Sequence, residues 1–381
     1  MKRVPIDRDE FPDTSGPKQE IPLEEDKYNH MKHNEENLNE REKNILRSVV
    51  QQFILTAAPV GSRNIAKKYE MGISPATVRN IMADLEESGY INHPHTSAGR
   101  MPTDKGYRYY VDSLMELKRV KKSEKGLISK SLKNEVTDTE ELFKVASSLL
   151  STITNQLACV TYPNIDSGIF EKLQIVSLTS TNLMVIISIK SGLVKTITLE
   201  INSDIKQSQL ETVQNLLNER LSGLRFSDIR KTLKDRLKDV GEKQKPVIRL
   251  FIDSVDKIFK EGRKADRLII TGARNIIKQP EFETPENFES IIELMENKDI
   301  IIHIMEKSNE AETDDIFISI GSENEDKKMQ DYSFISKEYK FGESVGTLGI
   351  VGPKRMEYSR VVAIVDYIAT MLSEFIKNPA L

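Results

Sequence analysis

The 381-residue sequence has little of several features that mark particular classes of protein. It contains a single cysteine, Cys159, which excludes a disulfide framework and a cysteine-based metal cluster, so we expect a reducing compartment. No apolar run approaches the roughly 20 residues that a membrane-spanning helix needs. The first five residues lead into an acidic, polar segment and not into the apolar stretch of a secretion signal. We therefore expect a soluble, cytoplasmic protein with no membrane partner.

Residue groupings typical of catalysis are also missing. Cys159 stands in an apolar stretch, where a buried and unreactive thiol is the usual finding. The glycines between residues 342 and 352 lack the Gly-Lys-Ser/Thr ending of a phosphate-binding loop, and no Ser/His/Asp grouping is evident. His303, between two isoleucines, fits a core or strand position. The sequence therefore predicts that the protein is not an enzyme and holds no cofactor and no metal.

Charge is distributed unevenly along a chain whose net charge is −4. Residues 1–37 hold 6 Lys and Arg against 10 Asp and Glu, with four prolines and few large apolar residues, so we expect a disordered tail. Residues 38–122 hold 14 basic against 9 acidic residues, and residues 123–381 hold 35 against 40. The positive excess is confined to one segment, as expected for a nucleic-acid footprint.

That basic segment predicts three helices, at about 40–56, 63–69 and 75–89. Ser62 is expected to cap the second helix and Ser74 the third, where Pro75 suits the first helical position. Gly89 supplies the stop of the third helix. A tight turn at 71–73 separates the second helix from the third. This spacing of helices and breakers indicates a helix-turn-helix motif.

The third helix has the pattern of a recognition helix. Apolar residues at 78, 81, 82 and 85 face inward, which leaves Thr77, Arg79 and Asn80 on the outer face of the first turns. A short strand at 90–91 and an exposed Pro/Gly/Ser-rich loop at 93–102 then predict a β-wing. An ordinary polar surface helix is the alternative for this helix taken alone, but three helices and a wing in sequence favour nucleic-acid binding.

We assign contact types to this motif from side-chain chemistry. Arg79 and Asn80 suit base edges in the major groove, whereas Arg63, Lys67 and Arg100 suit phosphates. The wing residues are expected at the backbone or the minor groove, with His95 having the alternative role of structuring its loop. The predicted DNA-binding residues are Ser62, Arg63, Lys67, Ser74, Thr77, Arg79, Asn80, His95, Thr96, Ser97 and Arg100.

Beyond the wing, Thr103 is expected to cap a further helix that carries an aromatic cluster at 107–110. Core packing is the better interpretation of this cluster than base stacking, because duplex DNA offers no unstacked bases. The DNA-binding domain is thus expected to span residues 38–118. The basic-then-polar segment that follows predicts a linker at 119–138.

The remaining chain alternates strand-rich and helical segments. A helix is predicted at 139–158, followed by three strands in a short-looped antiparallel meander, at 173–178, 183–189 and 193–199. The run 183–187 is apolar on both faces, which predicts a strand covered on both sides. Further strands are predicted at 316–320, 332–339 and 344–351, with a closing helix at 357–377.

A helical block at about 224–308 separates these strand-rich halves. Its helix 246–260 is apolar nearly all round, so it is buried either within its own domain or by a partner. We favour a homodimer interface here, because so small an insertion is not expected to bury the helix alone; packing within the domain is the alternative. The predicted interface residues are Val247, Phe251, Val255 and Phe259.

Four separated blocks of this sequence resemble the heat-inducible transcription repressor (HrcA) family. They are residues 74–86 (SPATVRNIMADLE), 95–111 (HTSAGRMPTDKGYRYYV), 275–282 (NIIKQPEF) and 349–362 (GIVGPKRMEYSRVV). The resemblance runs from about residue 38 to 375 and leaves out the acidic tail, which departs from the family pattern. Four blocks in the same order are far more specific than a helix-turn-helix pattern alone.

The resemblance implies an α+β multidomain protein with an N-terminal winged helix-turn-helix and a GAF-like antiparallel α/β domain. The GAF-like domain would be split into 139–223 and 309–381 by an inserted helical dimerisation domain at 224–308. The resemblance also implies a dimeric repressor of chaperone operons that binds an inverted-repeat operator and depends on the GroEL-type chaperonin. The alternative is a repressor that senses a small molecule through its GAF-like domain, for which a hydrophobic cavity with convergent polar groups would be the mark.

Overall fold

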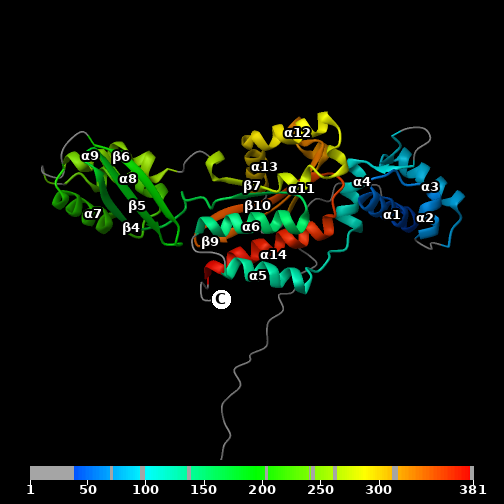
Figure 1. The fold of residues 1–381 in the computed structure, drawn as a ribbon, viewed down its shortest axis with the longest axis horizontal. Coiled ribbons are helices and arrows are strands. Elements are labelled where there is room, and N and C mark those ends of the chain that lie inside the picture. Colours follow the sequence, from blue (N-terminus) through cyan, green and yellow to red (C-terminus); the bar gives the residue numbers. More distant parts are fainter. Residues whose placement is uncertain are drawn as a thin grey trace, which may run out of the picture.

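The computed structural model is elongated, with three units in a row (Figure 1). The residues it describes are 38–68, 72–94, 99–134, 139–201, 205–239, 241, 245–260, 264–310 and 316–377. A winged-helix domain lies at one end, an α/β core in the middle, and a smaller unit inserted into the core at the other end. The predicted α+β class is therefore confirmed. The predicted tail at 1–37 lies outside the described residues.

The winged-helix domain forms as its breakers predict. Its elements are α1 (Glu40–Thr56), α2 (Ser62–Lys68), α3 (Pro75–Glu87), β1 (Ile91–Asn92) and β2 (Met101–Pro102). Asn39 caps α1 in a capping box with Glu42, and Ser74 caps α3. The Gly61 carbonyl accepts the first backbone hydrogen bonds of α2, so Ser62 lies inside that helix. The prediction that Ser62 caps α2 is therefore wrong.

The core is a five-stranded antiparallel sheet in the order β7-β3-β10-β9-β8. Its strands are β3 (Leu157–Thr161), β7 (Leu268–Thr271), β8 (Phe317–Ile320), β9 (Tyr332–Phe341) and β10 (Ser344–Pro353). Side chains alternate between the faces, so that Ala158 and Val160 of β3 join one hydrophobic cluster and Leu157 and Cys159 the other. The predicted later strands are confirmed.

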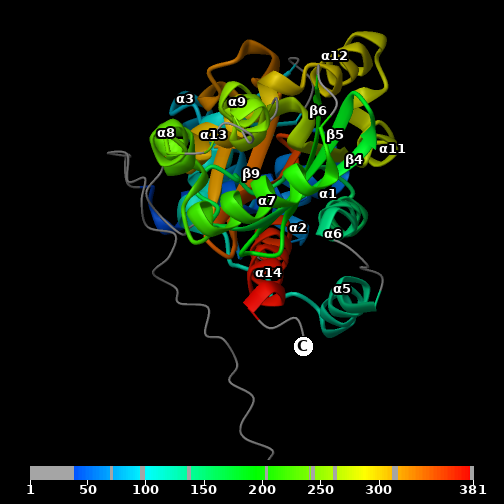
Figure 2. The same ribbon diagram turned by 90° about the vertical axis from the view of Figure 1, so that its left-hand side faces the viewer.

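Helices cover both faces of this sheet (Figures 1 and 2). On one side lie α6 (Thr139–Thr154) and α14 (Tyr358–Lys377), with α5 (Lys122–Asn134) outside them; on the other lie α12 (Pro285–Glu296) and α13 (Lys298–Glu310). The shorter helical turns of this part are η3 (Lys264–Arg267), α11 (Ala273–Ile276), η4 (Pro280–Phe282), η5 (Gly321–Glu323) and η6 (Lys327–Met329). His303 lies on α13 with an exposed side chain, and not in a core or strand position.

The segment predicted as a linker at 119–138 contains helix α5. Its Ile128 and Leu132, four residues apart, are both fully buried. Glu124 forms an ion pair with Arg360 of α14 at 2.8 Å. The many charged residues and Gly126 made this segment resemble a linker in the sequence. In the structure Gly126 lies on the open side of the helix, where a Cβ would meet no other atom.

The inserted unit has other boundaries than predicted. Strands β4 (Phe170–Thr179), β5 (Asn182–Ile189) and β6 (Val194–Glu200) form the predicted meander, but as a separate sheet. They pack on α7 (Gln207–Leu221), α8 (Phe226–Arg236), α9 (Lys245–Asp253) and α10 (Val255–Phe259) around a hydrophobic cluster of their own. The insertion therefore spans about 165–260 and mixes strands with helices. The predicted helical block at 224–308 joins parts of two units, because residues 264–310 pack on the core sheet.

The predicted helix 246–260 is two helices, α9 and α10, which meet at Ser254. Val247, Phe251 and Phe259 are 0–1% exposed, inside the cluster of the inserted unit, and the partly buried Val255 packs against it. The segment is apolar on nearly every side because its own domain surrounds it. This is the alternative interpretation, packing within the domain. They do not form an exposed seam for a second chain.

Candidate nucleic-acid interface

Helix α3 presents a polar face at one end of the molecule. Val78, Met82 and Leu85 are buried against the other helices of the domain, as the spacing predicts. Arg79 and Asn80 point the other way and are exposed, whereas Thr77 is half-buried. The outer face of the first turns therefore offers a guanidinium and an amide, the groups that form bidentate hydrogen bonds with guanine and adenine in the major groove.

The start of α3 is fixed by its cap. The backbone N–H of Thr77 donates to Ser74 Oγ at 3.1 Å, and the two side-chain hydroxyls lie 3.0 Å apart. Both predicted contact residues thus serve the helix itself in this conformation. The cap satisfies one backbone N–H of the first turn, and the other first-turn N–H groups and the helix dipole favour a phosphate there.

Helix α2, which packs on α3, carries basic side chains. Arg63 and Lys67 of α2 are exposed, whereas Ser62 is half-buried. Among the described residues, Arg63, Lys67 and Arg79 take part in no ion pair. Cations that have no carboxylate partner in the folded chain can bind phosphates without first losing an internal ion pair.

The base of the wing is tied to the rest of the domain. The backbone of Arg100 exchanges hydrogen bonds of 2.8 and 2.9 Å with Val60, between α1 and α2. A side chain at Gly99 would collide with this contact, because a Cβ there would lie 2.5 Å from the Val60 carbonyl carbon. This explains the glycine of the wing motif by close approach of two backbones.

Glu86, near the end of α3, is a site residue that sequence analysis missed. One of its carboxylate oxygens lies 2.6 Å from Arg100 Nη2, and the other is in contact with His93 Nδ1. Partial burial works to raise the pKa of Glu86, but the hydrogen bond with His93 and the charge of Arg100 outweigh it, so the pKa is lower than usual. Glu86 therefore holds Arg100, a predicted phosphate contact, in place beside the recognition helix.

The remaining wing residues, His95, Thr96 and Ser97, lie outside the described residues, so their assigned contacts stay predictions. The aromatic cluster that follows is placed in the core as expected. Tyr107, Tyr109 and Tyr110 are 2–6% exposed, and none is available for stacking on a base.

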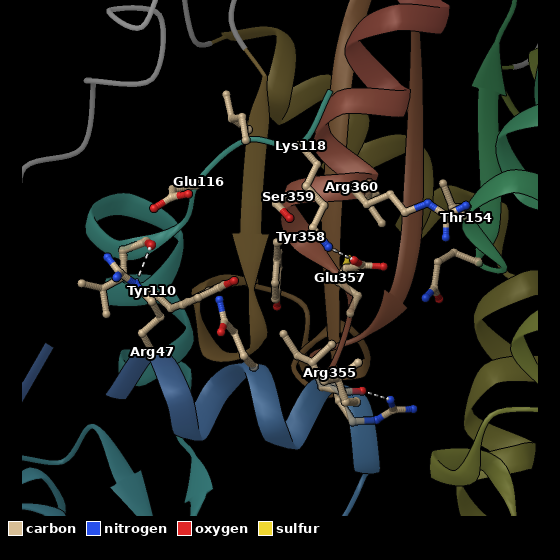
Figure 3. A pocket seen from close by; sticks show the side chains of 18 of the residues that line it. Arg47, Tyr110, Glu116, Lys118, Thr154, Arg355, Glu357, Tyr358, Ser359 and Arg360 are labelled. Atoms are coloured by element: carbon tan, nitrogen blue, oxygen red, sulfur yellow. Dashed lines mark hydrogen bonds and ion pairs between the residues drawn. The ribbon is translucent and has the colours of Figure 1, made fainter. Parts of the chain in front are cut away.

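A cleft of about 690 Å³ opens between α1 and the start of α14 (Figure 3). Its lining mixes apolar side chains such as Leu55 with charged ones, and two of the charged ones have partners within the protein: Lys118 pairs with Glu357, and Arg47 Nε donates to the Leu114 carbonyl at 3.2 Å. A small-molecule sensor would show an apolar cavity with a few convergent polar groups. Because this cleft has both kinds of lining, the small-molecule alternative stays a prediction.

Residues 37–114 match the family model described as the winged helix-turn-helix transcription repressor, HrcA DNA-binding, and residues 140–362 match the HrcA protein C-terminal domain. The chain belongs to the HrcA family. HrcA proteins are transcription repressors and not enzymes. The resemblance seen in the sequence, and the fold class and DNA-binding domain that it implied, are therefore confirmed.

Relatives and a solved structure agree with this membership. The chain is 40% identical over 344 residues to the heat-inducible transcription repressor HrcA of Chlorobium phaeobacteroides (strain BS1), with 88% of this chain and 97% of that one covered. The HrcA of Prosthecochloris aestuarii is 42% identical over the same shares. A crystal structure of a hypothetical protein at 2.2 Å resolution matches 90% of this chain and 100% of its own with a TM-score of 0.60 and 25% identity.

Other sequence-based expectations concern chemistry away from DNA. Burial raises the pKa of the Cys159 thiol to about 12, which fits the predicted unreactive cysteine. Within the described ranges, no cluster of His, Cys, Asp and Glu side chains has the makings of a metal site. In the same part of the chain, no helix has both the length and the apolar character to cross a membrane.

Proposed function

We propose that this HrcA-family protein represses chaperone operons by binding an inverted-repeat operator as a two-fold dimer in the cytoplasm. The observation that carries this proposal is the exposed polar face of α3, with Arg79 and Asn80 next to α2 and its exposed basic side chains Arg63 and Lys67. Arg79 and Asn80 read bases, and Arg63, Lys67 and Arg100 contact phosphates. The printed names of the relatives, heat-inducible transcription repressors, support the choice of target.

The inserted unit supports the dimer through a surface other than the predicted one. One face of its three-stranded sheet packs on the helices, and the other carries Val176, Leu178 and Val194, which are 39–62% exposed. Met184 and Ile186 of the middle strand lie on this same open face and are only half-buried. We had predicted that both faces of β5 are covered. Within the described residues, helices cover one face and leave the other open. We assign the second cover to another copy of this chain, since apolar patches of this kind mark interaction sites.

We also propose that the active fraction depends on a GroEL-type chaperonin. Strand β3 must pair with β10, with Thr161 and Thr347 in contact 186 residues apart, and the whole inserted unit lies between them. Such non-local pairing is slow and leaves apolar intermediates exposed. Because only folded dimer binds DNA, a chaperonin that raises the folded fraction raises operator occupancy by mass action.

The operator proposal is tested by mobility shift with the inverted repeat found upstream of the cell's own chaperone genes. We expect a complex that survives an excess of random duplex, and its absence at physiological salt would contradict the proposal. A second test refolds the protein from denaturant with and without chaperonin and titrates the operator. Equal active fractions at ordinary and raised temperature would remove the chaperonin step and favour a small-molecule signal.

A further inference from the structure

Helix α4 (Asp104–Tyr109) links the wing to the core and has two distinct faces. One face belongs to the winged-helix domain: a Cβ at Gly106 would lie 2.0 Å from the Tyr90 carbonyl oxygen, and the Tyr109 ring packs on Tyr90 at 5.3 Å. The other face turns to the core. This helix lies in the sequence block 95–111, which carries the family resemblance, and DNA contact does not explain its residues.

Arg108 makes the most extensive of these contacts with the core. Its Nε donates to Glu323 Oε1 at 2.7 Å, Nη2 pairs with the second carboxylate oxygen, and Nη2 also donates to the Ile318 carbonyl at 2.8 Å. The Arg108 side chain is only 12% exposed. A two-pronged guanidinium–carboxylate pair fixes orientation as well as distance, which a single point charge does not.

Asp104 supplies a second point of attachment. Its carboxylate binds Lys354 Nζ at 2.9 Å and accepts the backbone N–H of Ser322 at 2.9 Å. Gly321 permits this approach, because its φ is +54° and a Cβ there would lie 2.2 Å from Asp104 Oδ2. Any larger residue at 321 would push the carboxylate, and with it the start of α4, away from the core.

A third attachment joins the core to helix α1 of the winged-helix domain. Arg355, in the loop after β10, donates from Nη1 to the Ile54 carbonyl at 2.7 Å (Figure 3). That carbonyl is among the last of α1, where helix carbonyls lack intrahelical donors and favour a cation. Glu281 holds the same guanidinium through Nε and through Nη2 at 3.0 Å. Two of the sequence blocks beyond the DNA-binding domain, 275–282 and 349–362, therefore meet at this contact.

The three attachments surround an apolar seam. The Tyr107 ring of α4 lies 6.0 Å from the Tyr358 ring of α14, and one continuous hydrophobic cluster runs from the winged-helix domain into the core. Contacts of α4 through Asp104 and Arg108, and of the end of α1 through the Ile54 carbonyl, attach two helices of the domain to the core and so oppose its rotation. In a two-fold dimer this restraint determines how far apart, and at what angle, the two α3 helices stand.

We propose that this domain joint, formed by Asp104, Arg108, Gly321, Glu323, Lys354 and Arg355, sets the spacing between operator half-sites. Its members are positioning residues and touch no DNA. The inference rests on the proposed dimer. It assigns a role to sequence blocks that DNA contact and dimerisation leave unexplained. The joint acts on the geometry between two half-sites and leaves recognition of each half-site unchanged.

The test selects bound sequences from a library of random duplexes with the full-length protein. The test variant is Glu323→Ala/Lys354→Ala, in which both changes lie in the core, so the DNA-binding domain keeps its sequence. The matched control is Glu325→Ala/Lys328→Ala, which removes the same two charges from nearby core residues that pair with Lys307 and Glu293 instead. Thermal unfolding monitors folding. If the double variant is destabilised, Lys354→Ala alone replaces it, since Lys354 reaches the joint through a part-exposed ion pair.

We expect the wild type and the control to select an inverted repeat with one spacing, and the test variant to select the same half-site with several spacings. Binding of the test variant to the wild-type repeat should weaken roughly tenfold, with a single half-site bound as before, because simultaneous engagement depends on geometry. An unchanged single spacing in a folded variant would overturn the inference alone. Failure of the wild type to select any inverted repeat would instead overturn the proposed dimeric operator binding, and this inference with it.

Discussion

The two ends of the molecule differ in the chemistry of their open surfaces and in their attachment to the core. At one end, α3 offers Arg79 and Asn80 beside exposed cations, and the domain shares a hydrophobic cluster and several ion pairs with the core. At the other end, β4–β6 offer an apolar face, and the unit encloses a cluster of its own.

This difference separates two tasks. A polar, basic face fits DNA, which demands hydrogen bonds and positive charge, whereas an apolar sheet face fits a protein partner. The DNA-binding end is attached to the core by shared packing and ion pairs, as the proposed reading of two half-sites would require. The inserted end needs only a self-contained fold that presents its sheet. Each prediction below alters one end and leaves the other as its internal reference.

The largest effect is expected from charge on the open sheet face. Val176→Glu/Val194→Glu should give single chains by light scattering and weaken operator binding by roughly a hundredfold or more, since the second half-site contact is lost. Both residues are exposed, so the inserted unit should still fold. Leu127→Glu/Phe288→Glu is the control, because it charges two exposed hydrophobic residues of the core. A dimeric test variant would place the seam elsewhere.

Next in size is loss of base recognition at the other end. Arg79→Ala should reduce discrimination between operator and random duplex by about 1–3 kcal/mol, the value of a bidentate base contact. Arg41→Ala, an exposed arginine at the start of α1, is the matched control and should leave discrimination unchanged. Competition titrations with both duplexes measure the ratio. Full discrimination in Arg79→Ala and also in Asn80→Ala would remove both residues from base reading.

A smaller effect is expected where Glu86 holds the wing. Glu86→Gln and Glu87→Gln remove the same negative charge near DNA, but only Glu86 binds Arg100 and His93. We therefore expect Glu86→Gln to bind all duplexes roughly three- to tenfold more weakly than Glu87→Gln, the range of one partly exposed charge-assisted contact. Equal affinities of the two variants would show that the wing needs no such anchor.

The same carboxylate gives a pH dependence with a definite sign. Because the folded-state pKa of Glu86 lies below its usual 4.5, its ion pair with Arg100 and its hydrogen bond with His93 stabilise the base of the wing above that value. The contribution is lost as the pH falls from about 4.5 through the lowered folded-state pKa. The difference between Glu86→Gln and wild type in thermal unfolding should therefore persist at neutral pH and shrink under acid. A difference that grows under acid would contradict this assignment.

The smallest effect is expected from a single phosphate contact. Lys67→Ala should weaken binding to operator and random duplex alike and lower the slope of log affinity against log salt by about 0.9. Affinities across a salt series provide this slope. An unchanged slope would show that Lys67 lies off the DNA path.

Local structure was largely predictable from the sequence, and long-range packing was not. The three helices and the wing followed from caps and breakers, because residues such as Ser74 and Gly89 act on the backbone within a few positions of themselves. Periodicity identified α9 and α10 as buried but could not say by what, so Phe251 was assigned to a partner when its own domain covers it. The split into two sheets was hidden for the same reason.

In the candidate site, too, local features were predictable from the sequence and long-range contacts were not. Exposure of Arg79 and Asn80 followed from the helical pattern around them, whereas the anchoring of Arg100 by Glu86 depends on how the wing folds back. The pair of Arg108 and Glu323 joins residues 215 positions apart. No pattern in a single sequence indicates such a pair, because either side chain alone resembles a solvated surface charge.

The mass of the complex formed with one inverted-repeat duplex tests the central claim most directly. Light scattering of the full-length protein with this duplex should give two chains per duplex, and with a duplex carrying one half-site it should show much weaker binding. We expect two wild-type chains on the repeat, and we expect Val176→Glu/Val194→Glu to lose this two-chain complex. Both results would agree with a polar end that binds DNA and an apolar end that forms the dimer. A single chain bound with full affinity to the inverted repeat would contradict it.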